Sequence, residues 1–109
     1  YLPTGARKEI DILLLKYNGN DVLWYQVLEL KHGEFTEAEL QKLITYEKWI
    51  IRERAENSLQ VHPIALAFDF NEDVKNFARK RKEYKDRPIR LIKYHFDSKT
   101  KSIKIEEFK

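Results

Sequence analysis

Two apolar segments on either side of a tight turn constrain the fold of this chain more than any other feature. Residues 9–16 and 22–31 are rich in leucine, isoleucine and valine, and the turn residues 17–21 (YNGND) separate them. An Asn-Gly pair flanked by apolar runs is a strong signal for a β-hairpin. The folded region is therefore expected to open with two antiparallel strands.

Length and composition narrow the class of protein. The 109 residues predict one domain, residues 1–109, and 42% hydrophobic residues with 13% aromatics can fill its core. No apolar run approaches the roughly 18 residues of a membrane span, and the absence of cysteine excludes disulfides and thiolate metal sites. These features favour a cytoplasmic protein without a membrane partner.

The first residue, the lack of methionine and the net charge also carry information. The sequence begins at Tyr1 and lacks methionine, so we interpret it as a fragment of a longer chain whose upstream helix or domain is missing. The net charge of +3 is compatible with a nucleic-acid partner. An ordinary solvated surface explains the same charge.

The rest of the chain alternates between helical and extended patterns. Residues 32–35 (HGEF) are expected to break the second strand, and Thr36 with Glu39 forms a capping-box pattern at the start of a helix. The predicted elements that follow are a helix over 36–57, a strand over 61–70, a helix over 71–85, and a final hairpin of strands 89–96 and 102–108.

The second predicted helix has two unlike sides. Its inward-facing residues are expected to be Val74, Phe77, Ala78 and Tyr84, and its basic side carries Lys75, Arg79, Lys80, Arg81 and Lys82. The basic side either follows a phosphate backbone or is a solvated helix face. The whole order is β-β-α-β-α-β-β, which predicts an α/β fold with a central mixed β-sheet flanked by helices.

Charged residues stand within the first hairpin where apolar ones are expected. Glu9 and Asp11 share one face of the first strand, and Glu29 and Lys31 share one face of the second, because residues two apart point the same way. Opposed residues in a hairpin have numbers with a constant sum. A sum of 40 places Asp11 opposite Glu29, whereas a strict two-residue loop gives 39 and puts the acids on opposite faces, so their meeting requires a longer loop or a bulge.

Carboxylates that meet in this way need compensation. Like charges about 5–8 Å apart repel, and a divalent cation such as Mg²⁺ or Mn²⁺ bound to a few carboxylate oxygens relieves the repulsion. Lys31, on the same face, would orient water or stabilise charge on a phosphate. The alternative is that these residues simply mark strand ends, or that Glu29 pairs with Lys31.

These residues resemble the PD-(D/E)XK nuclease superfamily, whose signature is an acid on one strand, E-x-K on the next, and then a helix. Here the pattern reads Asp11, then Glu29-Leu30-Lys31, then the predicted helix 36–57. Residues 61–80 (VHPIALAFDFNEDVKNFARK) look similar to the C-terminal nuclease domain of archaeal mismatch and flap endonucleases. The resemblance covers about residues 5–95 and implies a restriction-endonuclease-like core.

The resemblance also implies roles for individual residues. Asp11 and Glu29 would bind the metal with the carbonyl of Leu30, Lys31 would serve the attacking water, and Gln41 would support it. The chain departs from the family pattern at several places. Ile10 stands where proline precedes the acid, Thr45 stands where a tyrosine is expected with Tyr46 one position later, Glu9 has no counterpart, and the N-terminal core helix is absent.

The sequence thus predicts a metal-dependent nuclease that hydrolyses phosphodiester bonds, with DNA favoured over RNA. The alternative from another class is a non-catalytic module on the same fold that binds nucleic acid or protein. A third possibility is that the first hairpin is a dimer edge, with its acids acting as gatekeepers against aggregation, and a homodimer is compatible with a nuclease too. Remaining aromatics and histidines are interpreted as core or surface residues: Trp24, Tyr25, Trp49, His32, His62 and His95.

Overall fold

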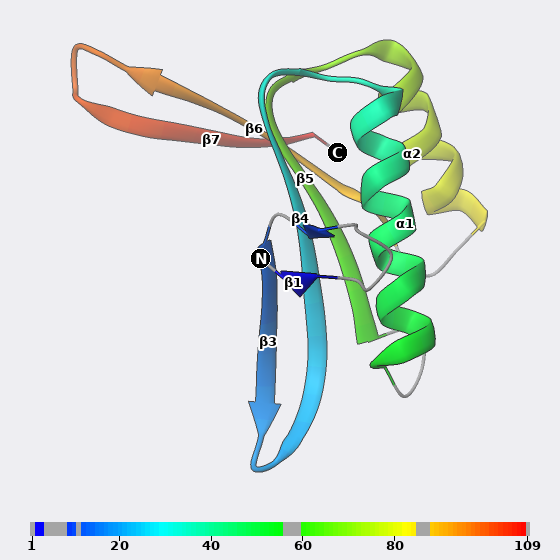
Figure 1. Cartoon of the computed structure of the whole chain (residues 1–109). Helices are drawn as coiled ribbons and strands as arrows, with labels where there is room; N and C mark the ends of the chain where they lie inside the picture. Colours follow the sequence, from blue (N-terminus) through cyan, green and yellow to red (C-terminus); the bar gives the residue numbers. More distant parts are fainter. Residues whose placement is uncertain (1, 4–8, 11, 56–59, 85–87, 109) are drawn as a thin grey trace.

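The computed structural model describes residues 2–3, 9–10, 12–55, 60–84 and 88–108 of the chain. Its helices and strands follow one another as shown in Figure 1. They are β1 (Leu2–Pro3), β2 (Glu9–Ile10), β3 (Ile12–Asn18), β4 (Asp21–Phe35), α1 (Glu37–Glu53), β5 (Val61–Phe70), α2 (Glu72–Tyr84), β6 (Arg90–Asp97) and β7 (Ser102–Phe108).

Five strands form one mixed sheet in the order β3-β4-β5-β6-β7. The two outer pairs, β3 with β4 and β6 with β7, are antiparallel hairpins, while β4, β5 and β6 run parallel to one another. The α/β class, the mixed sheet and the order of the main elements are therefore confirmed. The predicted first strand, 9–16, is divided. Glu9 and Ile10 form β2 and pair with β1 in a separate two-stranded sheet, and β3 begins at Ile12.

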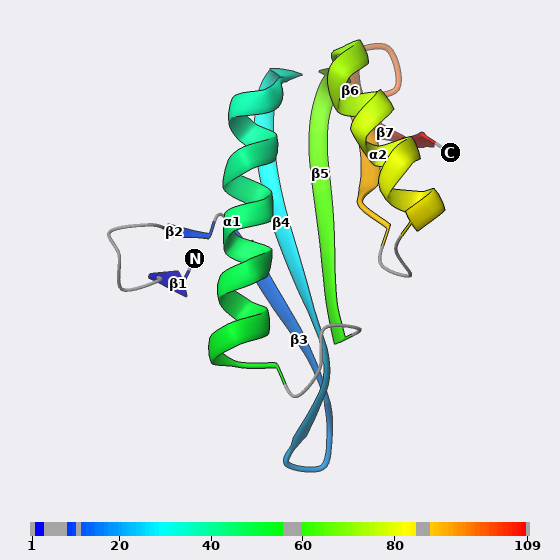
Figure 2. The same ribbon diagram turned by 90° about the vertical axis from the view of Figure 1, so that its right-hand side faces the viewer.

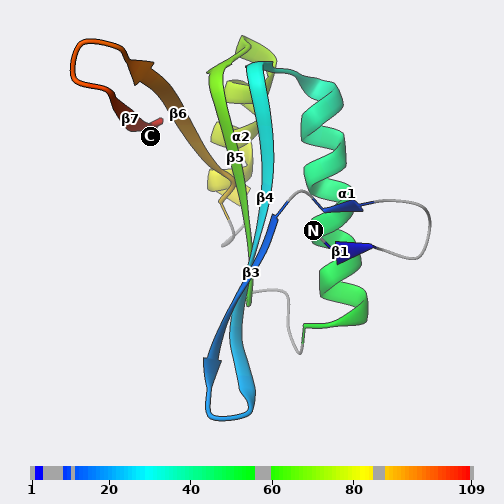
Figure 3. The ribbon, with the colours of Figure 1, turned by 60° about the vertical axis from the view of Figure 1, so that its left-hand side comes forward.

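Both described helices lie on the same face of the sheet (Figure 2). The chain moves in one direction across the sheet, from β4 to β5 and then to β6. Because crossovers between parallel strands are right-handed, two successive crossovers in one direction place their helices on one side. The described part of the domain thus has two layers, and neither helix extends over the other face of the sheet, which comes forward in Figure 3.

The hydrophobic core fills the space between α1 and the middle of the sheet. Alternate residues of β4 point toward the helix, and the buried residues of α1 recur at helical spacing as the sequence predicted. The fully buried large side chains in this layer include Val27, Phe35, Leu43 and Ile50. No helix in the described part of the chain is long and apolar enough to cross a membrane.

Strand β4 is longer than predicted. Residues 32–35 were expected to break it, but β4 continues to Phe35, which pairs with Phe70 of β5. The pairing with β5 shifts by one residue between Lys31 and Glu34, and Gly33 takes a φ of 131° within this irregularity. A bulge therefore absorbs the turn-like residues without ending the strand.

The first helix is shorter than predicted, and its cap is different. It ends at Glu53 within the described residues, rather than at residue 57, which lies outside them. Thr36 is the N-cap residue, but its side chain caps no backbone N–H. Instead the Thr36 hydroxyl donates a hydrogen bond of 2.7 Å to Oε2 of Glu39.

The prediction that Arg81 lies on a basic, exposed side of the second helix is wrong. Arg81 is buried between the helices, where its guanidinium donates to both carboxylate oxygens of Glu47 on α1. Val74 and Ala78 are buried as predicted, whereas Phe77, expected to face inward, is exposed. Packing of α2 against α1 explains the rotation, because it turns the Arg81 side of the helix toward Glu47. The side chain of Tyr84 lies outside the described part.

The Gly33 bulge provides a test of the β4 geometry. Gly33→Ala should lower the free energy of unfolding by about 1–3 kcal/mol, because a side chain is strained at this φ even though space for a Cβ is open. Gly19→Asn is the matched control, since Gly19 has a φ of 64° that asparagine tolerates. Urea denaturation measures both, and a Gly33→Ala protein as stable as wild type would contradict the bulge.

The buried ion pair between α1 and α2 provides a second test. Arg81→Leu should destabilise the fold by about 3–5 kcal/mol, because it leaves the Glu47 carboxylate buried without its guanidinium. The double variant Glu47→Leu/Arg81→Leu should recover most of that loss, since both charges are then removed. Lys80→Leu, at a neighbouring exposed position, is the control. Equal urea midpoints for Arg81→Leu and Lys80→Leu would contradict the buried pair.

Candidate active site on strand β4

The first hairpin has the register that the sequence analysis required. Its loop is the two-residue turn Gly19-Asn20, and the pairs next to it, such as Asn18 with Asp21, have numbers that sum to 39. The pairing shifts between Lys16 and Tyr17. From Lys16–Trp24 onward to Ile12–Leu28 the sum is 40. The bulge, rather than a longer loop, produces the sum that was predicted to bring Asp11 and Glu29 to one side.

The first acid of the motif is not itself described. Asp11 lies outside the described residues, and so does the side chain of Glu9, whose backbone belongs to β2. The last pair of the hairpin that the structure describes is Ile12 with Leu28, directly before the position of Glu29 on β4. The predicted meeting of Asp11 with Glu29 therefore stays a prediction.

Glu29 is a buried carboxylate in the middle of the fold. It is 3% exposed, and its Oε2 atom is withdrawn from solvent. It shares the helix-facing side of β4 with Tyr25 and Val27, both of which are buried in the core. Leu30, by the same alternation, points to the other side and is 44% exposed. A charge at such a position is costly unless neighbouring groups compensate it, so Glu29 is not an ordinary strand-end acid.

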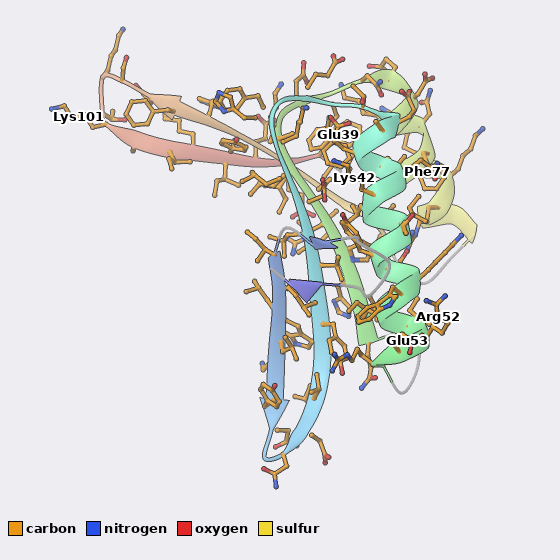
Figure 4. All side chains as sticks on the ribbon, in the orientation of Figure 1. Glu39, Lys42, Arg52, Glu53, Phe77 and Lys101 are labelled. Atoms are coloured by element: carbon orange, nitrogen blue, oxygen red, sulfur yellow. The ribbon has the colours of Figure 1, made fainter. Side chains whose placement is uncertain are left out.

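Lys31 also lies on the helix-facing side of β4. Its Nζ is 3.2 Å from Oε1 of Glu39, which lies in the first turn of α1, and the Lys31 side chain is 46% exposed. Figure 4 marks Glu39 at this end of the helix. Lys31 therefore stands where the core opens to solvent, one step along the strand face from Glu29. The shared face of Glu29 and Lys31 is confirmed.

Glu39 contacts Lys31, although the sequence did not predict Glu39 as a residue of the site. It was predicted as a helix-capping acid, but its carboxylate accepts from Thr36 and pairs with Lys31. Burial disfavours its charged form, yet the hydrogen bonds from Thr36 and Lys31 outweigh burial and lower the pKa of Glu39 below its ordinary value. The capping-box pattern identified Glu39 as a residue of the first helical turn, but its contact with Lys31 depends on how α1 lies over β4.

Gln41 and Tyr46, the two residues of α1 that the resemblance implied, lie on different sides of the helix. Gln41 is exposed on α1, and its backbone carbonyl accepts a hydrogen bond from the Thr45 hydroxyl. Tyr46 is buried on the side of α1 that packs against β4 and β5. Of the two, Tyr46 lies on the same side of the helix as the site, and Gln41 points toward solvent.

Potential metal ligands are few in the described part of the molecule. No group of three or more His, Asp or Glu side chains close enough to hold a cation occurs among the residues whose side chains the structure describes. Those residues exclude Asp11 and the side chain of Glu9. Glu29 and the backbone carbonyl of Leu30 are the described members of the predicted ligand set, and both offer oxygen atoms, which Mg²⁺ and Mn²⁺ prefer.

Comparisons with protein-family models, with curated proteins and with solved structures find no match to this chain.

The low pKa of Glu39 predicts a pH-dependent contribution to stability. Because the folded-state pKa is below that of the unfolded chain, ionised Glu39 stabilises the fold fully above the unfolded-state pKa, and this contribution is lost as the pH falls through the lower folded-state pKa. The difference in unfolding free energy between wild type and Glu39→Gln should therefore be steady above about pH 6 and shrink between about pH 5 and 3.

Urea denaturation at a series of pH values measures this difference. Thr36→Val, which removes one hydrogen-bond donor to Glu39, should weaken the pH dependence without abolishing it. A wild-type-minus-Glu39→Gln difference of the same size at pH 3.5 and pH 7 would contradict the assignment.

Proposed function

We propose that this chain is a metal-dependent nuclease domain that hydrolyses phosphodiester bonds of nucleic acid, with DNA favoured as substrate. The observation that carries the proposal is the pairing of a buried acid with a solvent-reaching lysine, Glu29 and Lys31, on one side of β4. This side faces the helix that follows the strand. It is the arrangement that the E-x-K pattern of the PD-(D/E)XK superfamily implies.

The order of the elements and the register of the first hairpin also support the nuclease proposal. The hairpin β3–β4, the helix α1 and the parallel strand β5 follow in the order expected of a restriction-endonuclease-like core. The register of sum 40 in β3–β4 meets the condition under which Asp11 stands opposite Glu29. We propose that the chain has this core, and that Asp11 completes the ligand set with Glu29 and the carbonyl of Leu30.

Each residue has a distinct part in the proposed reaction. Mg²⁺ or Mn²⁺, when bound, supplies a Lewis acid that activates water and neutralises phosphate charge. Glu29 contributes a fixed carboxylate whose burial keeps it in one position. Lys31, held by Glu39 at the edge of the core, orients the attacking water or stabilises negative charge that develops on the phosphate.

Glu39 and Tyr46 complete the surroundings of this site. Glu39 limits the freedom of the Lys31 side chain, so we assign it as a positioning residue for Lys31. Tyr46, buried on the site side of α1, replaces the tyrosine that the family pattern places one residue earlier. Gln41 keeps its proposed supporting role if substrate draws its exposed side chain toward the phosphate.

Substitution of the motif residues tests the proposal. Asp11→Ala, Glu29→Gln and Lys31→Met should each reduce cleavage by at least about 100-fold, since each removes a metal ligand or the group that acts on the water. The assay uses labelled single-stranded, branched and mismatched DNA and RNA with Mn²⁺, and a chelator should abolish all cleavage. Lys42→Met, at an exposed position on α1, is the matched control and should retain activity.

Folding is checked separately so that a loss of activity is not a loss of structure. Each variant should keep the wild-type circular dichroism spectrum. Cleavage by the Lys31→Met protein at the wild-type rate would contradict the assignment of Lys31, and cleavage in chelator would contradict metal dependence.

The Lys31–Glu39 ion pair favours a second candidate function. An ammonium that is 3.2 Å from a carboxylate already has a structural partner, as expected if the chain is a non-catalytic module that binds nucleic acid or protein on a nuclease-like fold. This candidate predicts no cleavage by wild type and no heat of Mn²⁺ binding. Calorimetry distinguishes the two, because the nuclease proposal predicts a heat that Glu29→Gln removes.

A further inference from the structure

The sheet face opposite α1 and α2 carries a large apolar surface. We call this side of the five-stranded sheet the open face. By strand alternation and register it includes exposed aliphatic and aromatic side chains from both hairpins and from β4. Its most exposed members are Ile12, Leu14, Leu30, Phe96, Ile103 and Ile105.

The hairpin β6–β7 shows most clearly that this face is built for burial. Phe96 pairs with Ile103 and Tyr94 with Ile105 on the open face, whereas His95 and its partner Lys104 alternate with them on the other side. Strict apolar–polar alternation is typical of strands with one buried face. Yet this hairpin projects beyond the helices, with Lys101 at its outer end (Figure 4), and Phe96, Ile103 and Ile105 are 62–68% exposed.

Ring contacts extend the same surface across the middle of the sheet. The ring of Phe68 on β5 lies 4.6 Å from His32 on β4 and 4.8 Å from Tyr94 on β6. These three rings join the apolar residues of the first hairpin to those of the last. The open face is thus one continuous surface rather than two separate patches.

The size of this surface matches a protein interface. Its six most exposed members are 37–68% exposed. At about 200 Å² for a fully exposed large side chain they present about 600 Å², before their half-buried neighbours are added. The largest apolar patch on a typical monomer is about 300–600 Å², so these six residues alone reach the upper end of that range. With the half-buried neighbours, the face approaches the area of about 800 Å² that each partner buries in a standard interface.

The charge of the open face indicates the kind of partner. Arg90 and Glu107, which lie on it, neutralise each other through hydrogen bonds of 3.0 and 2.8 Å, and Lys16 lies near the turn at one end. A nucleic-acid backbone would need a row of cations, and a strongly charged protein would need a complementary charge. A nearly neutral, apolar face is complementary to itself, as a two-fold interface requires.

We propose that the open face is the interface between two copies of this chain. The two sheets pack face to face at about the 10 Å spacing of stacked sheets, and the projecting β6–β7 hairpin of each copy covers the apolar residues of the other. The helix-facing side of β4, with Glu29 and Lys31, stays outside the interface in both copies. The proposal is therefore independent of the nuclease activity.

Sedimentation equilibrium at about 1–100 μM chain tests the interface. Wild type should have twice the chain mass of 13.2 kDa. Ile105→Asp should raise the dimer dissociation constant at least about 100-fold, because a two-fold symmetric interface contains the substituted residue twice and would bury two unpaired carboxylates. Lys104→Asp is the matched control. Residue 104 is next to Ile105 in the sequence, but its side chain lies on the other face of β7, so this variant should remain dimeric.

A second variant keeps the test decisive if Ile105→Asp does not fold. Leu30→Lys, at an exposed position on β4, should also give monomers with a wild-type circular dichroism spectrum. A monomeric wild type across the concentration range, or a dimer that survives both folded variants, would overturn the proposal. So would a monomer that binds a single-stranded oligonucleotide and loses that binding on Ile105→Asp, because the face would then belong to nucleic acid.

Discussion

Burial of one side of β4 beneath α1 is the interaction on which the rest of this structure depends. β4 is paired on both edges, with β3 and with β5, so hydrogen bonds to two neighbouring strands hold its backbone in place. Val27 on the strand and Leu43 and Ile50 on the helix are fully buried, and each such side chain contributes about 1.5–3 kcal/mol of burial free energy. This packing sets the position of every residue on the same side of the strand, Glu29 and Lys31 included.

Two ion pairs lie in the layer between the helices and the sheet, and in each the charged groups contact each other directly. Arg81 and Glu47 meet in a buried two-point pair that ties α2 to α1. Lys31 and Glu39 meet where the core opens to solvent, and Thr36 completes the contact. Such pairs add little net stability compared with apolar residues, but removing one partner is costly. They therefore fix how the helices sit on the sheet, and with it the surroundings of Glu29.

Much of the fold could be predicted from the sequence because the relevant signals are local. The Asn-Gly pair at residues 18 and 19, the alternation in the hairpins and the 3.6-residue period of α1 identify their elements directly. The continuation of β4 to Phe35 could not be predicted, since pairing with β5 outweighs the turn preference of His32-Gly33. The burial of Arg81 was hidden for a similar reason, because its partner Glu47 is 34 residues away.

The candidate site shows the same division. Alternation along β4 correctly placed Glu29 and Lys31 on one side, and arithmetic on the hairpin register required a longer loop or a bulge, of which the structure has the bulge. The role of Glu39 depends on how α1 lies over β4, which no local pattern encodes. The apolar open face was equally hidden, because its residues come from separate hairpins that become neighbours only in the sheet.

Paramagnetic broadening by Mn²⁺ tests the central claim most directly, because it locates a bound cation in the folded chain without requiring catalysis. At substoichiometric Mn²⁺, the amide signals of residues 28–31 and of the residues around Asp11 should broaden selectively, while those of residues 99–101 at the outer end of the β6–β7 hairpin stay sharp. Glu29→Gln should restore the β4 signals. Uniform broadening, or broadening that leaves β4 unaffected, would contradict a cation site built on Glu29 beside Lys31.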